Sequence, residues 1–239
     1  MTFVEAEIAS QPDCWRRAIV VARDLSGSTG LSGATGLSGT AALGNPGERL
    51  ALIGCGTSWF VAQVAAAWRE SAGLGETDAF TASEVPDRSY DRVIAITRSG
   101  TTTEVLEVLH RVQGSIPTTV VLGDLATPAP ELADIVVDLS FADEQSVVQT
   151  RFATSALVLF RAAWRGDVDG LPEAAAQAVA ADMGVETVGG HRTPDLPLQN
   201  AARRKRIRLR RTGFAYGQNF TFGATSSCGR ASPTSKNSR

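Results

Sequence analysis

The body of this chain has no lysine, and its few cysteines follow no pattern. Of the 239 residues, the lysines are Lys205 and Lys236, so residues 1–200 cannot form a Schiff base through a lysine side chain. Cys14, Cys55 and Cys228 are far apart and lack the spacing of a disulfide framework or a zinc site. We therefore expect no metal and no cofactor.

Long apolar runs are also missing. No apolar stretch approaches the length of a membrane span, and the N-terminus shows no basic segment followed by an apolar one. We therefore expect a cytoplasmic protein without a membrane partner. Hydrophobic residues still make up 43% of the chain, which is enough for a sizeable core in one large or two small domains.

Basic side chains are scarce until the last part of the chain. Residues 201–239 hold ten of the 23 Lys and Arg and none of the 25 Asp and Glu. Residues 1–200 therefore carry 13 basic and 25 acidic side chains, a formal charge of −12. Such a body offers no basic surface to nucleic acid, so a nucleic-acid partner is not expected there.

Residues 91–109 join a buried strand to a helix through a loop of hydroxyl residues. The β-branched run at 93–96 predicts a strand buried on both faces, and the apolar spacing over 104–109 predicts a helix. The free N–H groups of a helix start, joined by hydroxyls, form an anion site. An ordinary N-cap is the alternative, but it needs fewer hydroxyls. We favour phosphate binding by Thr97, Ser99, Thr101 and Thr102.

A second unit of the same build spans residues 50–68. A strand at 50–53 leads into a turn in which Gly54 and Gly56 allow a close backbone approach, and Thr57 and Ser58 supply hydroxyls at the helix start. Parallel strands bring such loops to one edge of a sheet, so the two units together predict one shared site.

The order of the elements predicts an α/β fold. Strands are expected near residues 50, 79, 94, 120 and 136, with helices between most of them, as a three-layer α-β-α sandwich around a mainly parallel five-stranded sheet. A long helix over 146–164 and a shorter one over 173–183 follow. The expected segments are an N-terminal helix in 1–25 that begins near Pro12, a Gly/Ser-rich linker (26–47), the main domain (48–166), a helical extension (167–200) and a basic tail (201–239).

Three further titratable residues have two readings each. Glu84 follows the strand near residue 79, and it is either a site carboxylate or a solvated loop acid. His110, on a predicted helix, and His191, in a predicted loop, could serve as bases by residue type. We favour a surface or packing role for both histidines.

Four motifs in order carry a resemblance to a known family. They are Glu7-Ile8 with Gln11-Pro12, the turn at 54–58, Arg98-Ser99-Gly100 with Thr102, and the segment 144–150. Together they resemble the sugar isomerase (SIS) family, which includes the isomerase part of glucosamine-6-phosphate synthase and related sugar-phosphate isomerases and deaminases. The resemblance covers residues 5–165 and implies the fold above, with a topology of flavodoxin type.

The resemblance also implies roles for individual residues. In that family the loop SxSGxT holds the sugar phosphate, which matches Thr97, Ser99 and Thr102, with Arg98 in the variable place. The resemblance therefore implies that these four residues bind the substrate. The turn at Thr57 and Ser58 is then beside the sugar. The same pocket is lined by Val147, Val148 and Gln149, whereas Arg151, at a position where lysine is common, is expected to serve structure.

The chain also departs from the family. Members with this N-terminal signature carry two SIS domains, and their catalytic Glu, His and Lys come largely from the second, which is missing here. We therefore expect a sugar-phosphate ligand, a homo-oligomer, and little or no isomerase turnover from the chain alone. Residual turnover is expected only if Glu84 or a residue of a partner copy substitutes for the missing base, and a non-catalytic phosphosugar-binding or regulatory module is the alternative.

The basic tail, residues 201–239, has two readings. Its arginines suit an arm for nucleic acid or an acidic partner. The preferred hypothesis is a frameshift that scrambled the second domain. Codons for Gly-Leu-Ala-Asn-Glu, typical of that domain's catalytic helix, can read Ala-Ser-Pro-Thr one base over, and residues 231–234 have this sequence.

Overall fold

The computed structural model describes residues 3–27, 42–181, 185–188 and 191–194, and it divides the chain into two units, residues 1–182 and 183–239. The second unit contains the antiparallel pair β6 (Val185–Val188) and β7 (His191–Pro194). The prediction of a loop at His191 is therefore wrong, because this residue begins a paired strand. Residues 201–239, the predicted basic tail, lie outside the described residues.

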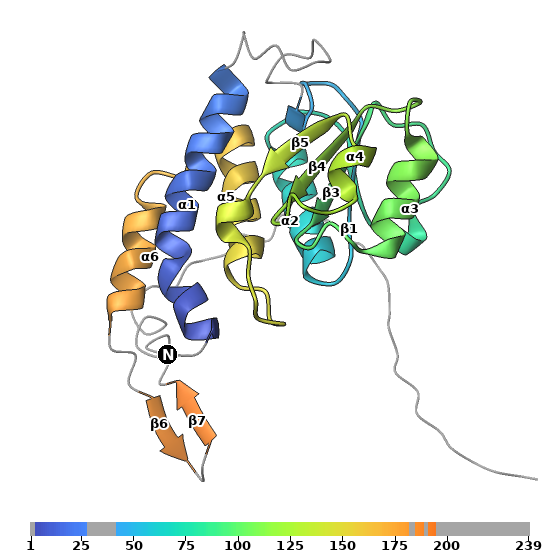
Figure 1. The fold of residues 1–239 in the computed structure, drawn as a ribbon. Coiled ribbons are helices and arrows are strands. Elements are labelled where there is room, and N and C mark those ends of the chain that lie inside the picture. The colour runs from blue at the N-terminus through green and yellow to red at the C-terminus, as the bar shows by residue number, and fades with distance from the viewer. Residues whose placement is uncertain (1–2, 28–41, 182–184, 189–190, 195–239) are drawn as a thin grey trace, which may run out of the picture. The chain divides into compact units, whose positions relative to one another are not determined.

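The first unit is built on a five-stranded parallel sheet (Figure 1). Its strands are β1 (Leu50–Gly54), β2 (Thr77–Thr81), β3 (Arg92–Thr97), β4 (Thr118–Leu122) and β5 (Ile135–Asp138), in the spatial order β2-β1-β3-β4-β5. This order is the flavodoxin type, so the predicted fold class is confirmed. Every residue of β1, β3 and β4 is buried, as their apolar and β-branched composition predicts.

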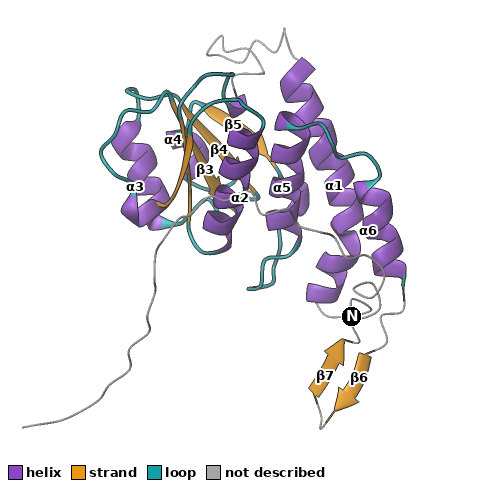
Figure 2. Ribbon diagram, turned by 180° about the vertical axis from the view of Figure 1, so that it is seen from behind, coloured by secondary structure: helices purple, strands orange, loops and turns teal. Residues whose placement is uncertain are grey.

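Helices cover both faces of the sheet (Figure 2). The helices α1 (Phe3–Gly27), α2 (Thr57–Ser71) and α5 (Arg151–Trp164) form one core with the even-numbered residues of β1 and β3, Leu50 and Ile94 among them. On the other face, α3 (Thr103–Val112) and α4 (Ala129–Leu132) pack on the odd-numbered residues. The helix α6 (Leu171–Ala180) packs on α1. None of the described helices is long and apolar enough to cross a membrane.

Two helix starts differ from the prediction. α1 begins at Phe3 and continues through Pro12, where the sequence suggested a start. A proline removes one helical hydrogen bond, and the packing of α1 along α5 compensates for this loss. α5 begins at Arg151 and not at residue 146. The reason is that the Glu144 carboxylate accepts the first N–H groups of the helix, which fixes the helix start at Arg151. The last helix spans 171–180, where 173–183 was expected.

The end of the predicted linker belongs to the core. Ala42 and Leu43 are buried, and the Thr119 hydroxyl of β4 donates to the Ala42 carbonyl oxygen at 2.6 Å. Residues 28–41, the rest of the Gly/Ser-rich stretch, lie outside the described residues.

Candidate functional site

The site lies where the strand order changes direction. From β1 the chain crosses to β2 on one side, and from β3 it crosses to β4 on the other, so the loops after β1 and β3 diverge. In open parallel sheets, ligands bind at the carboxyl ends of the strands at this switch point. Both loops singled out in the sequence, 55–57 and 98–102, stand there.

The loop after β3 is fixed by a glycine. Gly100 has a φ of +61°, and a Cβ there would lie 2.0 Å from the Thr127 hydroxyl oxygen, so only glycine fits. The Gly100 carbonyl accepts the N–H of Ala129 at 3.3 Å, and the Arg98 carbonyl accepts that of Gly123 at 3.0 Å. The loop is therefore held firmly against the connection between β4 and α4.

The predicted phosphate ligands of this loop take different positions. The Thr97 hydroxyl is buried and accepts the N–H of Gly100 at 3.3 Å, so it shapes the loop. The Thr101 hydroxyl lies 3.1 Å from that of Ser99. Thr102 is the N-cap of α3, yet its side chain makes no capping hydrogen bond with any described residue. No side chain of the described residues therefore caps the first N–H groups of α3.

The loop after β1 approaches the same place with glycines. A Cβ on Gly54 would lie 2.7 Å from the Ser58 backbone, so α2 packs directly on the end of the strand. Gly56 is the N-cap of α2 with a φ of +55°, and no atom lies within 4 Å of where its Cβ would be. Thr57 is exposed at the helix start, whereas Ser58 is buried.

Cys55 lies in the turn after β1, and β1 pairs directly with β3, so its thiol is near the start of α3. Burial raises the pKa of Cys55, the backbone of Ala82 lowers it, and the Glu104 carboxylate in the first turn of α3 raises it again. Glu104 was not among the residues predicted from the sequence, although an acidic residue in the first turn of a helix is favourable because it faces the positive end of the helix dipole. Glu84 is exposed in the 3₁₀ turn Ala82–Glu84 that follows β2 at the same edge.

The segment 143–150, called the 143–150 loop below, begins beside the loop after β3. One Arg98 nitrogen (Nη1) donates to a carboxylate oxygen of Asp143 at 3.2 Å and to the Glu144 carbonyl oxygen. The predicted pocket residues of this loop lie differently: Val147 is 99% exposed, Val148 is 66% exposed and Gln149 is half-buried. The two valines therefore contribute little to any pocket within the described residues.

Glu7 of α1 holds the same loop from the other side. It is buried, and one of its carboxylate oxygens accepts the N–H groups of Gln145 at 2.7 Å and Ser146 at 3.2 Å. The Arg151 guanidinium adds bonds to the Ser10 hydroxyl and the Asp143 carbonyl. The sequence singled out Glu7 only as part of a motif, because partners 138 residues away leave no local signal.

The bonds to Glu7 predict a stability that depends on pH. Burial raises its pKa, but the Ser146 side chain, the two backbone N–H groups and the Arg151 charge outweigh burial and bring it below the ordinary 4.5. A lowered native pKa stabilises the fold above the unfolded value, and this contribution is lost as the pH falls through the native value. The difference in unfolding free energy between wild type and Glu7→Gln should be constant above pH 4.5 and shrink below it. Urea unfolding at several pH values measures this, and a constant difference down to strongly acid pH would contradict it.

Neither histidine belongs to these loops. His110 is exposed in the last turn of α3, and His191 belongs to the other unit. Among the described residues, no group of three or more His, Cys, Asp or Glu could hold a metal ion.

No protein-family model matches the chain, and no curated protein matches it in sequence. Solved structures are similar. The C-terminal domain of glucosamine-fructose-6-phosphate aminotransferase from Francisella tularensis has a TM-score of 0.58 and 20% identity, over 77% of this chain and 55% of that one. Tagatose-6-phosphate ketose/aldose isomerase from Escherichia coli has a TM-score of 0.58 and 18% identity, over 75% of this chain and 53% of that one. The chain thus spans about half the length of these structures, and its fold is that of the sugar isomerase domain.

Proposed function

We propose that this chain binds a sugar phosphate between the N-termini of α2 and α3, with the phosphate group at the start of α3. The observation that carries the proposal is the pairing of two helix starts at one switch point, neither of which is capped by a side chain among the described residues. Such starts present N–H groups and a positive dipole to an anion. The names of the aminotransferase and the isomerase described above refer to sugar 6-phosphates, which supports the same ligand class here.

Each residue of the site has a proposed part in binding. The N–H groups of the first turn of α3 and the hydroxyls of Ser99, Thr101 and Thr102 donate to the phosphate. Thr57, exposed at the start of α2, reaches the sugar. Residues 1–200 have a formal charge of −12, so the net charge of this part of the chain repels a phosphate dianion. Binding therefore requires hydrogen-bond donors that point at the phosphate.

We propose binding, not turnover, as the function of the described unit. Aldose–ketose conversion needs a base for a carbon-bound proton as well as donors at the oxygens. The described loops at this edge hold no histidine, and Glu84 is exposed. A phosphosugar-binding module uses the same donors without the base, and a homo-oligomer of such modules remains part of this proposal.

The Thr102 hydroxyl offers a direct test of the binding site. Thr102→Val keeps the shape of the N-cap residue and removes a donor that no described residue uses. Hydrogen bonds to charged groups are strong, so affinity for fructose 6-phosphate and glucosamine 6-phosphate should fall about tenfold in titration calorimetry. Ser115→Ala, beyond the other end of α3, is the matched control and should not change affinity. A folded wild type that gives no heat with either sugar phosphate would refute the proposal.

A further inference from the structure

We propose that Arg98 is a positioning residue: it ties the 143–150 loop to the phosphate-binding loop and does not itself contact the phosphate. The inference rests on the proposed function, which makes the loop after β3 the phosphate loop. It also revises the role that the sequence resemblance gave to Arg98 as a substrate-binding residue.

The path of the side chain leads away from the switch point. Gly123 follows β4, and a Cβ on it would lie 3.1 Å from the Arg98 carbonyl oxygen and 3.3 Å from the Arg98 Cγ atom. β4 flanks β3 on the side opposite β1. The stem of Arg98 therefore runs over the end of β4, whereas the proposed phosphate position lies between β3 and β1.

The guanidinium is already engaged at the end of this path. Its Nη1 donates to the Asp143 carboxylate at 3.2 Å and to the Glu144 carbonyl, and the side chain is 27% exposed. Only Nη1 makes these bonds, and Nε is buried without a hydrogen-bond partner among the described residues, so it does not face solvent. A phosphate bound through Nη1 would take this nitrogen from both acceptors and leave the Asp143 carboxylate, a negative charge, near the incoming dianion.

Arg98 thus connects the phosphate loop to Glu144, the residue whose carboxylate caps α5. The carbonyl of Glu144 binds Arg98, while its buried carboxylate accepts the N–H groups of Thr150, Arg151 and Phe152. The position of Gln149 relative to Ser99 therefore depends on the bond between Arg98 and the loop. Losing this bond should disturb contacts to the sugar and leave the phosphate donors in place.

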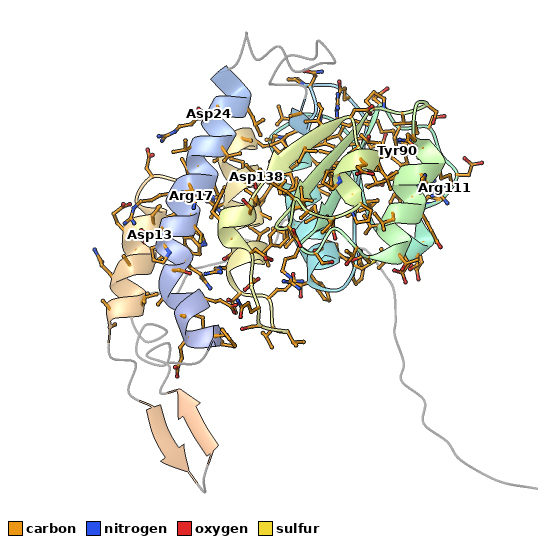
Figure 3. The ribbon with its side chains drawn as sticks, in the orientation of Figure 1. Asp13, Arg17, Asp24, Tyr90, Arg111 and Asp138 are labelled. Atoms are coloured by element: carbon orange, nitrogen blue, oxygen red, sulfur yellow. The ribbon has the colours of Figure 1, made fainter. Side chains whose placement is uncertain are left out.

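The test compares the full chain with Arg98→Met, Asp143→Asn and the double variant. Titration calorimetry uses inorganic phosphate and fructose 6-phosphate as probes. Each single variant should weaken fructose 6-phosphate about fivefold and inorganic phosphate by less than about twofold, as expected for one partly exposed ion pair. The double variant should match the singles, because both remove the same contact. Arg111→Met removes an exposed charge of α3 (Figure 3) that donates only to the Val85 carbonyl oxygen, at 3.5 Å, among the described residues, and it should change neither affinity.

A phosphate-binding Arg98 gives the opposite pattern. Arg98→Met would then weaken both probes equally, and Asp143→Asn, which frees the guanidinium, would leave affinity unchanged or increase it. Either result would overturn the inference.

Amide hydrogen exchange without ligand separates this inference from the proposed function. In Arg98→Met the amides of Gln145 and Ser146 should exchange faster than in wild type, because the loop has lost one of its attachments. If the wild-type protein binds neither probe, the proposed function is refuted, but the positioning role is not. The exchange data then test the positioning role by themselves. Unchanged exchange at these amides would refute that role.

Discussion

Replacing Glu144 by alanine should lower the free energy of unfolding by about 3–5 kcal/mol, the largest effect expected at the site. Glu144 is 2% exposed. Its carboxylate accepts the N–H of Thr150 at 2.7 Å, of Arg151 at 2.9 Å and of Phe152 at 3.1 Å, besides the Thr150 hydroxyl at 3.0 Å. Alanine would leave these donors without an acceptor at the buried start of α5.

Urea unfolding followed by circular dichroism measures the effect of Glu144→Ala. Glu144→Gln is the matched variant, because it keeps a carbonyl oxygen and should lose roughly half as much stability. Affinity for fructose 6-phosphate should fall with the alanine variant, since the 143–150 loop is attached through the same residue. An alanine variant within about 1 kcal/mol of wild type would show that Glu144 does not cap α5.

Arg69→Met should destabilise the fold by a similar amount, about 3–5 kcal/mol, without a direct effect on the ligand. Arg69 is fully buried in α2, and its guanidinium donates to the Asn45 carbonyl at 2.7 Å, the Glu48 carbonyl at 3.0 Å and the Thr77 hydroxyl at 2.9 Å. It thereby joins the segments before β1 and β2 at the amino edge of the sheet, opposite the site.

The measurement for Arg69→Met is again urea unfolding, with sugar-phosphate titration under native conditions beside it. Arg165→Met, in which an exposed arginine bond to Ser71 is lost, is the control and should cost less than about 1 kcal/mol. We expect the amino edge of the sheet to stabilise the fold and the carboxyl edge to bind the ligand. A folded Arg69→Met protein with normal stability but weak ligand binding would contradict this expectation.

The sheet could be predicted from sequence because its signals are local. The runs at 50–53 and 93–96 are buried strands, and the hydroxyl loops that follow them reach one edge by the geometry of parallel crossovers. The prediction of a site at Ser99, Thr102 and Thr57 rests on the same local signal.

The contacts that shape the site could not be predicted, because they join distant parts of the chain. Glu7 binds backbone 138 residues away, and Arg98 reaches 45 residues along the chain to Asp143. The start of α5 predicted from the sequence is too early, because Val147 and Val148 continue an apolar helical period. In the structure both valines are exposed in the 143–150 loop, before the helix begins. A buried carboxylate that caps a helix from seven residues away leaves no period in the sequence.

Residues 201–239 lie outside the described residues, so both readings of them stay predictions. Translating the gene past residue 200 in the other two frames decides between them. An open frame that encodes a second sugar isomerase domain supports the frameshift, and two closed frames exclude it.

The central claim is that backbone N–H groups at the starts of α2 and α3 bind a sugar phosphate. Titration of the ¹⁵N-labelled chain with fructose 6-phosphate, followed through its amide resonances, tests this claim most directly. Hydrogen bonds to a phosphate dianion shift the donating amides, so the largest changes should fall on residues 56–58 and 99–105, and inorganic phosphate should reproduce those at 99–105. Changes confined to other parts of the chain, or no changes at millimolar ligand, would contradict the account.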